Sequence, residues 1–524
     1  MKKILSILLA LTMLLALLAG CGNNSGGNSQ GGEPSNNPGN SQDGDADQSA
    51  ARESLVVAVP SEPKSLDAHG ANDNSSTMIK HLIYDTLLKQ ADDGSAAPNL
   101  VESWDYEDDL TLNLHLRSGV KFHNGETLDA GDVLYNIKRA YASDYTNWMV
   151  STVDLEQSKV IDDTTLQLKL TTPTGAMLAQ LCFLYIVDEQ TVEGGADMEE
   201  TPIGTGPFVF DSWFRGDRID LKTNQEYWGT VAPFNNLTMR VISESSSRAM
   251  EIEAGGVDVA INIASNDMAN LDANPDVTLM SEAGYSNSFI GFNCSSEPFN
   301  NKTLRQAVSY ALDRESIVQA VFSGTGSLAN GPIAPTIWGY DPDLEGYSYD
   351  VEKAKALMAE AGYPDGLDVT LTISDSQERV DIAEMVQNQL GKIGINVTVE
   401  PLENATYLDR IIAADCQMFI LGWVTNTGDA DYGLYEPFYT GQPTWANTAT
   451  YGNPEVDRLL DIGKQSTDSD VRFDAYCQVQ RLIVEDAPWV FLCNKNESAA
   501  CRSDIQGFKV PPSGRYEYNT ITFN

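Results

Sequence analysis

The residues best suited to chemistry in this chain lie in one short stretch that mixes an amide, two carboxylates and three aromatic rings. None of these side chains is a strong nucleophile. Amides and carboxylates hydrogen-bond polar groups, carboxylates attract cations, and aromatic rings pack on flat or apolar groups. The stretch is therefore equipped to hold a ligand. Its members are Trp423, Asn426, Asp429, Asp431, Tyr432 and Tyr435.

Signatures of common hydrolases and nucleotide-binding enzymes are missing from the part of the chain that is predicted to fold. From Leu55 onward there is no Gly-x-Ser-x-Gly, no His-Glu-x-x-His and no Gly-x4-Gly-Lys followed by Ser or Thr. All 4 histidines precede residue 124 and show no metal-ligand spacing. We therefore expect a protein that is not an enzyme and that has no metal or other cofactor.

Length and charge narrow the possible partners. The chain has 524 residues, which suits several domains of about 150 residues, and 42% of them are hydrophobic. With 33 basic and 75 acidic residues the formal net charge is −42, which opposes the attraction on which phosphate-backbone binding depends. Nucleic acid is thereby excluded as a partner, whereas an acidic surface suits a soluble exported protein.

The chemistry-bearing stretch follows a region with a regular alternation of strands and helices. Two strand-helix units lead into a nearly continuous apolar strand that ends at Trp423. This succession predicts a doubly wound α/β sheet, in which ligands bind in the crevice outside the carboxyl ends of the strands. The loop 424–432 should therefore border the ligand. The expected elements are strands at 367–374, 395–402 and 416–423 and helices at 377–390 and 405–414.

Earlier segments predict a mixed sheet and a further α/β unit. Leu110, Leu112, Leu114 and Leu116 alternate with polar residues and predict the buried face of a strand. Residues 237–263 predict a strand, a helix and a strand with a right-handed crossover over a parallel pair. Further expected elements are a strand at 54–60, a helix at 129–140, strands near 160 and at 166–170, a helix capped by Asn301 and a helix at 351–361 capped by Asp350.

The first residues carry export signals. Two lysines precede an uncharged apolar run, 4–19, that is short for a membrane span. Its end, Leu18-Ala19-Gly20-Cys21, resembles the lipobox of bacterial lipoproteins, which implies a signal peptide at 1–20 and lipidation of Cys21. Residues 22–51 contain no Val, Ile, Leu, Met or aromatic residue, so 21–53 should be a flexible linker. We expect the folded body on the outer face of the bacterial cytoplasmic membrane, tethered to it by lipid.

Short motifs follow one another along the folded part of the chain. They are Ser65-Leu66-Asp67, residues 116–126 with Asp132-Val133, residues 202–208, Tyr227-Trp228, Arg305-Gln306-Ala307, residues 361–364 and Gly422-Trp423. Together they resemble the extracytoplasmic solute-binding proteins of ABC importers in the oligopeptide, dipeptide and nickel class (family 5). The resemblance implies an α/β clamp of the periplasmic-binding-protein type (type II, cluster C), in which two lobes are joined by two hinge strands and lobe one contains an inserted third subdomain.

The resemblance also implies limits for these parts. Lobe one would comprise 54–75, 201–288 and 494–524, the inserted subdomain 76–200 and lobe two 295–487, with hinge strands at 289–294 and 488–493. Cys294 and Cys493 would follow neighbouring hinge strands, so their disulfide is the one to test. Buried free thiols are nevertheless the favoured state of all six cysteines other than Cys21, since no two form a Cys-x-x-Cys pair.

A function follows from the same resemblance. Such a clamp closes on a solute that contacts both lobes and then presents it to a permease. We expect a monomer that captures a small peptide or peptide-like ligand and works with the permease and ATPase subunits of an ABC importer. An oligosaccharide or a metal chelate as ligand, or a sensor lipoprotein without import, stays open as an alternative.

The resemblance assigns roles to individual residues. Asn426 occupies the place of the aspartate that holds the ammonium group in dipeptide binders, and an amide supplies no charge there. Asp429 or Asp431 could replace that aspartate or could cap a helix. Asn72 and Asn74 correspond to a first-lobe segment beside the ligand.

Two readings are open for the aromatic residues. Trp423 is either a wall of the cleft or the buried end of a strand. Tyr432 and Tyr435 either touch the ligand or pack locally.

Overall fold

The computed structural model describes residues 53–91 and 94–524. The predicted signal peptide 1–20, Cys21 and nearly all of the linker 21–53 lie outside the described residues. Within the described residues no helix combines the length and the apolar character that crossing a membrane requires.

A single 11-stranded sheet connects most of the described chain. Its strand order is β15-β14-β16-β12-β17-β11-β1-β10-β9-β8, with β13 paired to β17. Three smaller sheets accompany it. The strands of the large sheet are β1 (Ser54–Val59), β8 (Phe208–Phe214), β9 (Arg218–Thr223), β10 (Asn236–Val241), β11 (Val259–Ile261), β12 (Val277–Phe292), β13 (Gly326–Leu328), β14 (Leu367–Ser374), β15 (Ile395–Leu402), β16 (Met418–Val424) and β17 (Trp489–Arg502).

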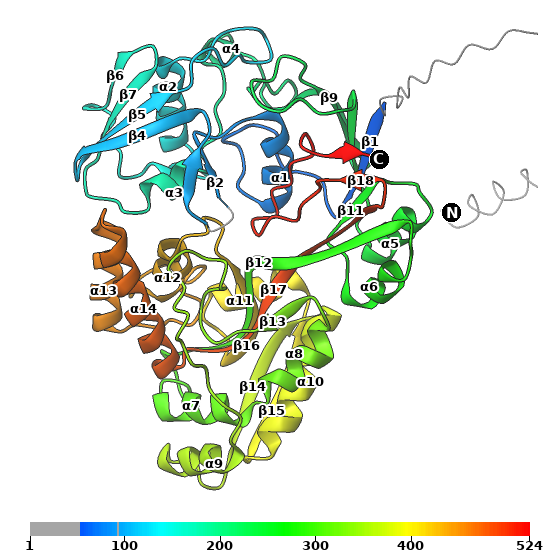
Figure 1. Cartoon of the computed structure of the whole chain (residues 1–524). Helices are drawn as coiled ribbons and strands as arrows, with labels where there is room; N and C mark the ends of the chain where they lie inside the picture. The colour runs from blue at the N-terminus through cyan, green and yellow to red at the C-terminus, as the bar shows by residue number, and fades with distance from the viewer. Residues whose placement is uncertain (1–52, 92–93) are drawn as a thin grey trace, which may run out of the picture. The chain divides into compact units, whose positions relative to one another are not determined.

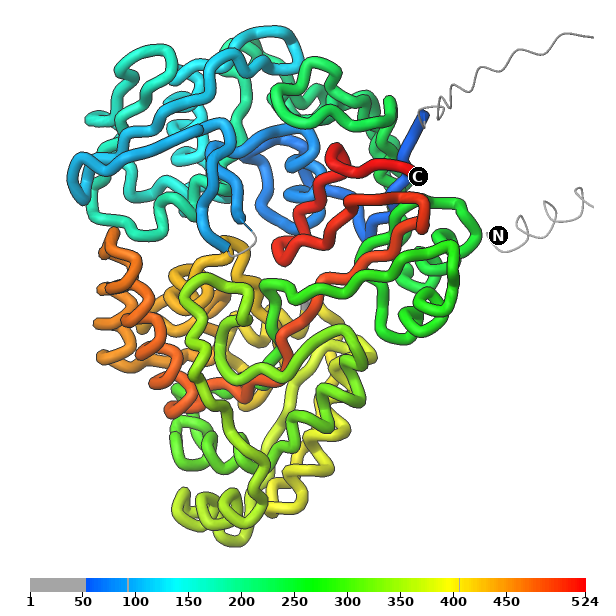
Figure 2. The backbone as a smooth tube through the Cα atoms, in the orientation of Figure 1, coloured from blue at the N-terminus to red at the C-terminus, as the bar shows by residue number. Residues whose placement is uncertain are grey.

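The first lobe, defined by its cores, comprises residues 53–277 and 499–524. β1 lies between β10 and β11 and is parallel to both. The predicted unit at 237–263 therefore has the predicted elements, with α5 (Ser245–Glu253) as its helix, but its two strands are not neighbours. The tail after β17 returns along this lobe (Figure 2) and buries residues such as Phe508 and Tyr518 in its core.

A separate core inside the first lobe spans residues 87–186. In its hairpin, Leu112, Leu114 and Leu116 are buried as predicted, but Leu110 is 39% exposed. Leu110 lies in the turn, where its amide donates to the Asp108 side chain at 2.9 Å. The elements here include α1 (Asn74–Ile83), which leads into this region, β2 (Leu88–Gln90), β3 (Ala96–Pro98), β4 (Val101–Asp108), β5 (Thr111–Leu116), α2 (Ala130–Tyr141), β6 (Lys159–Asp162), β7 (Thr165–Lys169), α3 (Met177–Leu181) and α4 (Glu189–Glu193).

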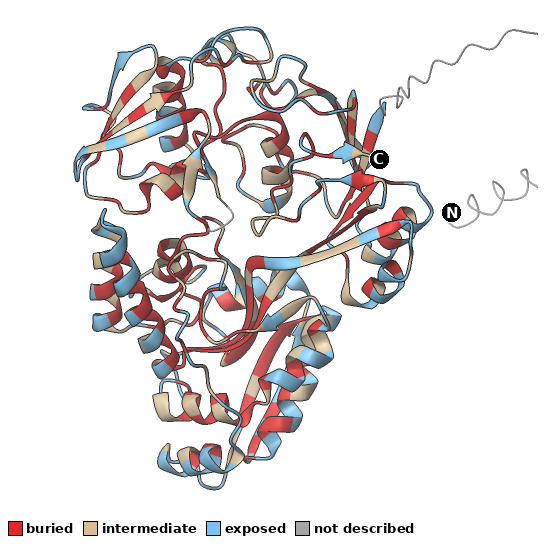
Figure 3. Cartoon of the chain, viewed as in Figure 1, coloured by how far each residue is buried: buried red, intermediate tan, exposed pale blue. Residues whose placement is uncertain are grey.

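The second lobe, residues 285–493, contains the predicted doubly wound region. β14 is parallel to β15 and to β16, and β16 is antiparallel to β12. Figure 3 shows these strands mostly buried and the helices exposing their outer faces. Asn301 and Asp350 cap their helices as predicted. The helices are α7 (Lys302–Ala311), α8 (Arg314–Phe322), α9 (Val351–Glu360), α10 (Gln377–Gly391), α11 (Asn404–Ile412), α12 (Ala430–Phe438), α13 (Pro454–Gln465) and α14 (Ser469–Asp486).

β12 and β17 pass from one lobe to the other side by side (Figure 1). They are 16 and 14 residues long and pair antiparallel over most of their length. Their residues change core between 281 and 284 and between 494 and 498. Residues of the segments 289–294 and 488–493 contribute to the second-lobe cores.

The six cysteines of the described residues are free, as the sequence favoured. The Cys294–Cys493 disulfide is absent because Cys493 pairs with Ser288 across the ladder. Cys294 lies six positions beyond Ser288, roughly 20 Å along an extended chain. A disulfide requires Cα atoms within about 7 Å of each other.

Candidate functional site

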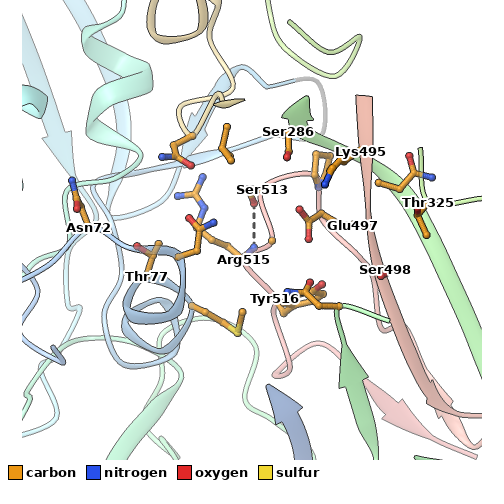
Figure 4. Close-up of a pocket in the computed structure, with 18 of the residues that line it drawn as sticks. Asn72, Thr77, Ser286, Thr325, Lys495, Glu497, Ser498, Ser513, Arg515 and Tyr516 are labelled. Atoms are coloured by element: carbon orange, nitrogen blue, oxygen red, sulfur yellow. Dashed lines mark hydrogen bonds between the residues drawn. The ribbon is translucent and has the colours of Figure 1, made fainter. Parts of the chain in front are cut away.

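A cavity of about 660 Å³ is lined by both lobes and by the crossing strand β17. Figure 4 shows side chains from these elements turned toward it. Its wall includes residues from five segments: 71–78 around the start of α1, 377–381 at the start of α10, 424–432 after β16, 495–498 of β17 and 512–516 of the tail. The first-lobe and second-lobe parts of this wall come from segments far apart in the sequence, so only the complete fold assembles the site.

Four of the predicted residues line this cavity: Asn72 and Asn74 from the first lobe, and Asn426 and Tyr432 from the second. Burial raises the pKa of Tyr432 to about 12, and the neighbouring Asn426 side chain opposes this rise. Tyr432 is therefore neutral near pH 7 and can donate or accept a hydrogen bond.

Aromatic rings form a continuous contact from the second lobe to the first. Trp423 stacks on Tyr432 with ring centroids 5.7 Å apart, and Tyr432 contacts Trp148 at 5.7 Å. Trp148 in turn contacts Phe183 at 6.0 Å. Tyr432, Trp148 and Phe183 line the cavity, whereas Trp423 supports Tyr432 from outside the lining. A flat or apolar group entering the cavity would meet rings from both lobes.

Asp429, Asp431 and Tyr435 are not part of the cavity lining. Asp429 caps α12 and forms an ion pair with Arg472 at 2.8 Å, both side chains being less than a tenth exposed.

The other two side chains are also engaged elsewhere. Asp431 is buried, which raises its pKa, and accepts a hydrogen bond from the Tyr476 hydroxyl at 3.3 Å. Tyr435 stacks on Tyr439 at 4.4 Å. The N-cap and the first two turns of α12 thus carry these three side chains into internal contacts of the second lobe.

Charged residues of the hinge strand and the tail were missed by sequence reasoning. Lys495 and Glu497 lie two positions apart on β17, and Arg515 comes from the tail. The polar run 494–497 between two apolar runs was the available signal on β17. For Arg515 the sequence offers no local signal, because the tail reaches the cavity only through its packing in the first-lobe core.

The charges in the wall differ in how they are held. Lys495 forms an ion pair with Glu378 at 2.7 Å. Lys80 donates to the main-chain oxygens of Ala68 and Ala71, and burial lowers its pKa to about 8. Burial raises the pKa of Glu497 to about 7.

One side chain connects the cavity wall with the loop of the other lobe. The Gln90 side-chain oxygen accepts a hydrogen bond from Arg515 Nη2 at 2.7 Å. Its amide nitrogen donates to the main-chain oxygen of Thr427, next to Asn426. Gly428 follows with φ +63°, and a side chain there would collide with the Gln90 amide. Gln90 thereby joins the first lobe to the ligand-facing loop of the second.

The arrangement offers binding groups and no evident catalytic pair among the described residues. Four serines line the cavity, at 265, 286, 498 and 513, but the lining includes no histidine. In the described part of the chain no group of three or more His, Cys, Asp or Glu side chains is placed to hold a metal ion. Hydrogen bonding, charge pairing and aromatic packing are what this cavity can supply.

Comparisons with known proteins agree with this architecture. The family described as bacterial extracellular solute-binding proteins, family 5 Middle, matches residues 95–445. Heme-binding protein A of Haemophilus influenzae is 30% identical over 451 residues, covering 80% of this chain and 82% of that protein. Glutathione-binding protein GsiB of Pectobacterium atrosepticum is 29% identical over 482 residues, covering 89% and 94%.

A solved structure extends the similarity to the fold. The ABC transporter-associated periplasmic binding protein DppA from Helicobacter pylori, in complex with the peptide STSA, aligns with a TM-score of 0.76 and 29% identity. The alignment covers 90% of this chain and 98% of DppA. The chain therefore belongs to the family 5 extracellular solute-binding proteins of ABC importers, whose role is substrate binding.

Proposed function

We propose that this protein captures a peptide or peptide-like solute outside the membrane and delivers it to the permease of an ABC importer. The observation that supports this is a cavity walled by both lobes that combines aromatic rings with charges of both signs. Peptides present main-chain polar groups, charged termini and side chains of every kind, and this wall can meet each of them. Among the similar proteins, DppA was solved with a peptide and GsiB is named for glutathione.

Closure of the two lobes would couple binding to delivery. A ligand that contacts Asn72 on one side and Tyr432 on the other stabilises the state in which both are close. The hinge would lie at 281–284 and 494–498, where β12 and β17 leave one core and enter the other. The closed state would then be recognised by the permease, and the ATPase subunits would drive transport.

Anchoring through Cys21 completes the proposal. The sequence Leu18-Ala19-Gly20-Cys21 supports lipidation, and residues 22–51 have the composition of a tether. The protein would act as a monomer at the outer face of the cytoplasmic membrane. Globomycin, which blocks the lipoprotein signal peptidase, should leave a precursor that retains residues 1–20. The wild type should incorporate labelled fatty acid and a Cys21→Ser variant should not, and an unlabelled wild type would contradict lipid anchoring.

The decisive experiment is mass spectrometry of the solute that co-purifies with the protein from its own host. The protein is purified without being unfolded and refolded, so that it keeps its ligand. Denaturing it should then release peptides of two to eight residues. Returning them to stripped protein should reduce the radius of gyration measured by X-ray scattering. Recovery of an oligosaccharide, a metal chelate or haem instead would overturn the peptide assignment. Loss of labelled-peptide uptake in a strain that lacks this protein would support import over a role in sensing alone.

A further inference from the structure

Most charged groups of the cavity already have partners within the protein. The Lys495 ammonium contacts both carboxylate oxygens of Glu378 at 2.7 and 2.9 Å. Asp381 accepts a hydrogen bond from the Gln377 side chain at 2.7 Å. Lys80 is held by main-chain oxygens, as described above. These groups need no ligand to satisfy them.

Glu497 is the exception among the carboxylates. It projects from β17 into the cavity (Figure 4), and burial is the cause of its raised pKa. Among the described residues no donor or cation pairs with its carboxylate. Across the ladder its partner is Glu282, and Lys495 on the same face is engaged by Glu378. A partly buried carboxylate without a partner is unfavourable, and a cation brought by a ligand would relieve it.

Arg515 is the exception among the cations. It is only 9% exposed, and its guanidinium lies 4.1 Å from the Phe183 ring. Nη1 donates to the main-chain oxygen of Cys182 at 3.1 Å and Nη2 to the Gln90 side chain at 2.7 Å.

None of these partners carries a charge that would balance the guanidinium. In the described chain no carboxylate forms an ion pair with Arg515. A guanidinium has five N–H donors in a fork that matches a carboxylate. Arg515 is therefore placed to receive an anionic group.

On the basis of the proposed function, we propose that Glu497 and Arg515 determine which solutes the cavity accepts. Glu497 binds an ammonium group of the captured peptide, and Arg515 binds a carboxylate of the same molecule. The ligand is thus dipolar, and both of its charged ends are held by β17 and the tail. Asn426 and Tyr432 then close on it from the second lobe.

Other acids near the predicted loop do not offer the ammonium a site. Asp429 is engaged by Arg472, and Asp431 by Tyr476, and neither lines the cavity. An ammonium at either place would have to displace a buried internal contact. Glu497 requires no such displacement.

The test varies the ligand and the protein independently. Three pools of random-sequence tetrapeptides are offered to the unaltered protein in native mass spectrometry: free termini, N-acetylated, and C-amidated. The retained free-termini sequence is then synthesised in all three forms and titrated calorimetrically at pH 8. We expect acetylation or amidation each to weaken binding about tenfold or more. Because the protein is unaltered in these arms, no folding defect can produce the result.

Single-residue variants show which side chain is responsible for each loss of affinity. Glu497→Gln should weaken the free peptide about tenfold and leave the N-acetylated peptide unchanged, and Arg515→Gln should behave likewise toward the C-amide. Glu253→Gln removes one negative charge from an exposed residue of α5 outside the cavity lining and should change nothing. Arg502→Gln, from an arginine ion-paired with Asp504, is the matched control for Arg515.

Two results would overturn the proposal in different ways. If acetylated and amidated peptides bound as tightly as free ones, or if Glu497→Gln left the free peptide unaffected, the assignment of the anchors would be wrong while the peptide function stood. If no peptide of any pool were retained, the proposed function would be wrong, and so would the roles assigned to Glu497 and Arg515.

Discussion

Asp85 accepts hydrogen bonds from three side chains in the interior of the first lobe. Thr205 and Trp228 donate to one carboxylate oxygen at 2.9 Å each, and Tyr227 donates to the other at 3.0 Å. The three donors belong to the short motifs 202–208 and Tyr227-Trp228 that were visible in the sequence. Those motifs therefore act on the packing of the first lobe, at a distance from the ligand-facing loop.

Replacing Asp85 with Ala should lower the free energy of unfolding by about 3 kcal/mol or more, because three buried donors would lose their acceptor. Urea denaturation followed by tryptophan fluorescence measures the change. Asp85→Asn keeps an acceptor and should lose less. The control is Asp105→Ala, since Asp105 is an exposed carboxylate paired with His115. Equal losses for Asp85→Ala and Asp105→Ala would show that the buried bonds contribute little.

Glu497 should make the stability of the ligand-free protein depend on pH. Burial raises its pKa from 4.5 to about 7, so the folded state binds more protons than the unfolded state between those values. The stabilisation of the folded state by protonated Glu497 is therefore fully present below about pH 4.5 and is lost as the pH rises through about 7. Tyr516, Lys495, Arg515 and Glu282 are the ionisable neighbours of Glu497, and burial raises the pKa of Tyr516 well above its ordinary value, away from that window.

A Glu497→Gln variant should accordingly melt about 1–3 °C above the wild type at pH 8, with a smaller difference at pH 5. Differential scanning fluorimetry across this range measures both melting curves. Glu253→Gln serves as the control for the loss of one charge. A constant difference between wild type and Glu497→Gln at every pH would refute the assigned titration.

Individual residues also show what sequence reasoning can reach. Asn72, Asn74 and Asn426 are predicted from the resemblance and Tyr432 from its place in the loop after the apolar strand, and the structure brings all four to one cavity. For Asp429 the sequence left a ligand role and a cap open, because its partner Arg472 lies 43 positions away. The pairing partners of a carboxylate are a tertiary property that local sequence does not contain.

Among the elements, the β2–β3 hairpin has a role that its sequence does not suggest. Gln90, at the end of β2, hydrogen-bonds Arg515 on one side and the Thr427 main chain on the other. The hairpin is thus the element through which the cavity wall of one lobe holds the loop of the other. Closure should be less stable without that bridge.

A Gln90→Ala variant should bind the retained peptide about 3- to 10-fold more weakly, mainly through faster dissociation. Stopped-flow measurement of tryptophan fluorescence gives both rate constants, with Trp148 and Trp423 near the ligand as reporters. Lys89→Ala, at the exposed neighbouring position, is the control. An unchanged dissociation rate would show that the bridge does not stabilise the closed state.

Predictability differs between the elements for a physical reason. The strands β14, β15 and β16 and the helices between them were predicted nearly to the residue, because each buries a regular apolar pattern. β12 and β17 were expected only as short hinge strands. Each passes through two different cores and a polar middle, so no single periodicity describes it.

At the scale of the whole molecule, thiol chemistry should not contribute to stability. The six described cysteines are free, and burial raises the pKa of Cys182 and Cys493 to about 12. Reducing agent should leave the melting temperature unchanged, within about 1 °C. Native protein should react slowly with Ellman's reagent and release six equivalents only after denaturation. A reductant-sensitive melting curve would reveal a disulfide.

The pairing of β12 with β17 fixes how the two lobes can move. Two separate tethers would allow the lobes to twist freely, but one ladder of hydrogen bonds flexes most readily about a single axis. Its register shifts lie between 283 and 286 and between 288 and 289, and these irregularities concentrate the bending. Lys495 pairs with Ser286 at this very place, and Glu497 is two residues away. These charged side chains of the cavity thus lie at the hinge, where a bound ligand would move little while the outer edges of the lobes move much farther. The hinge region would then select the ligand by its charges, and the cavity entrance would select it by its size.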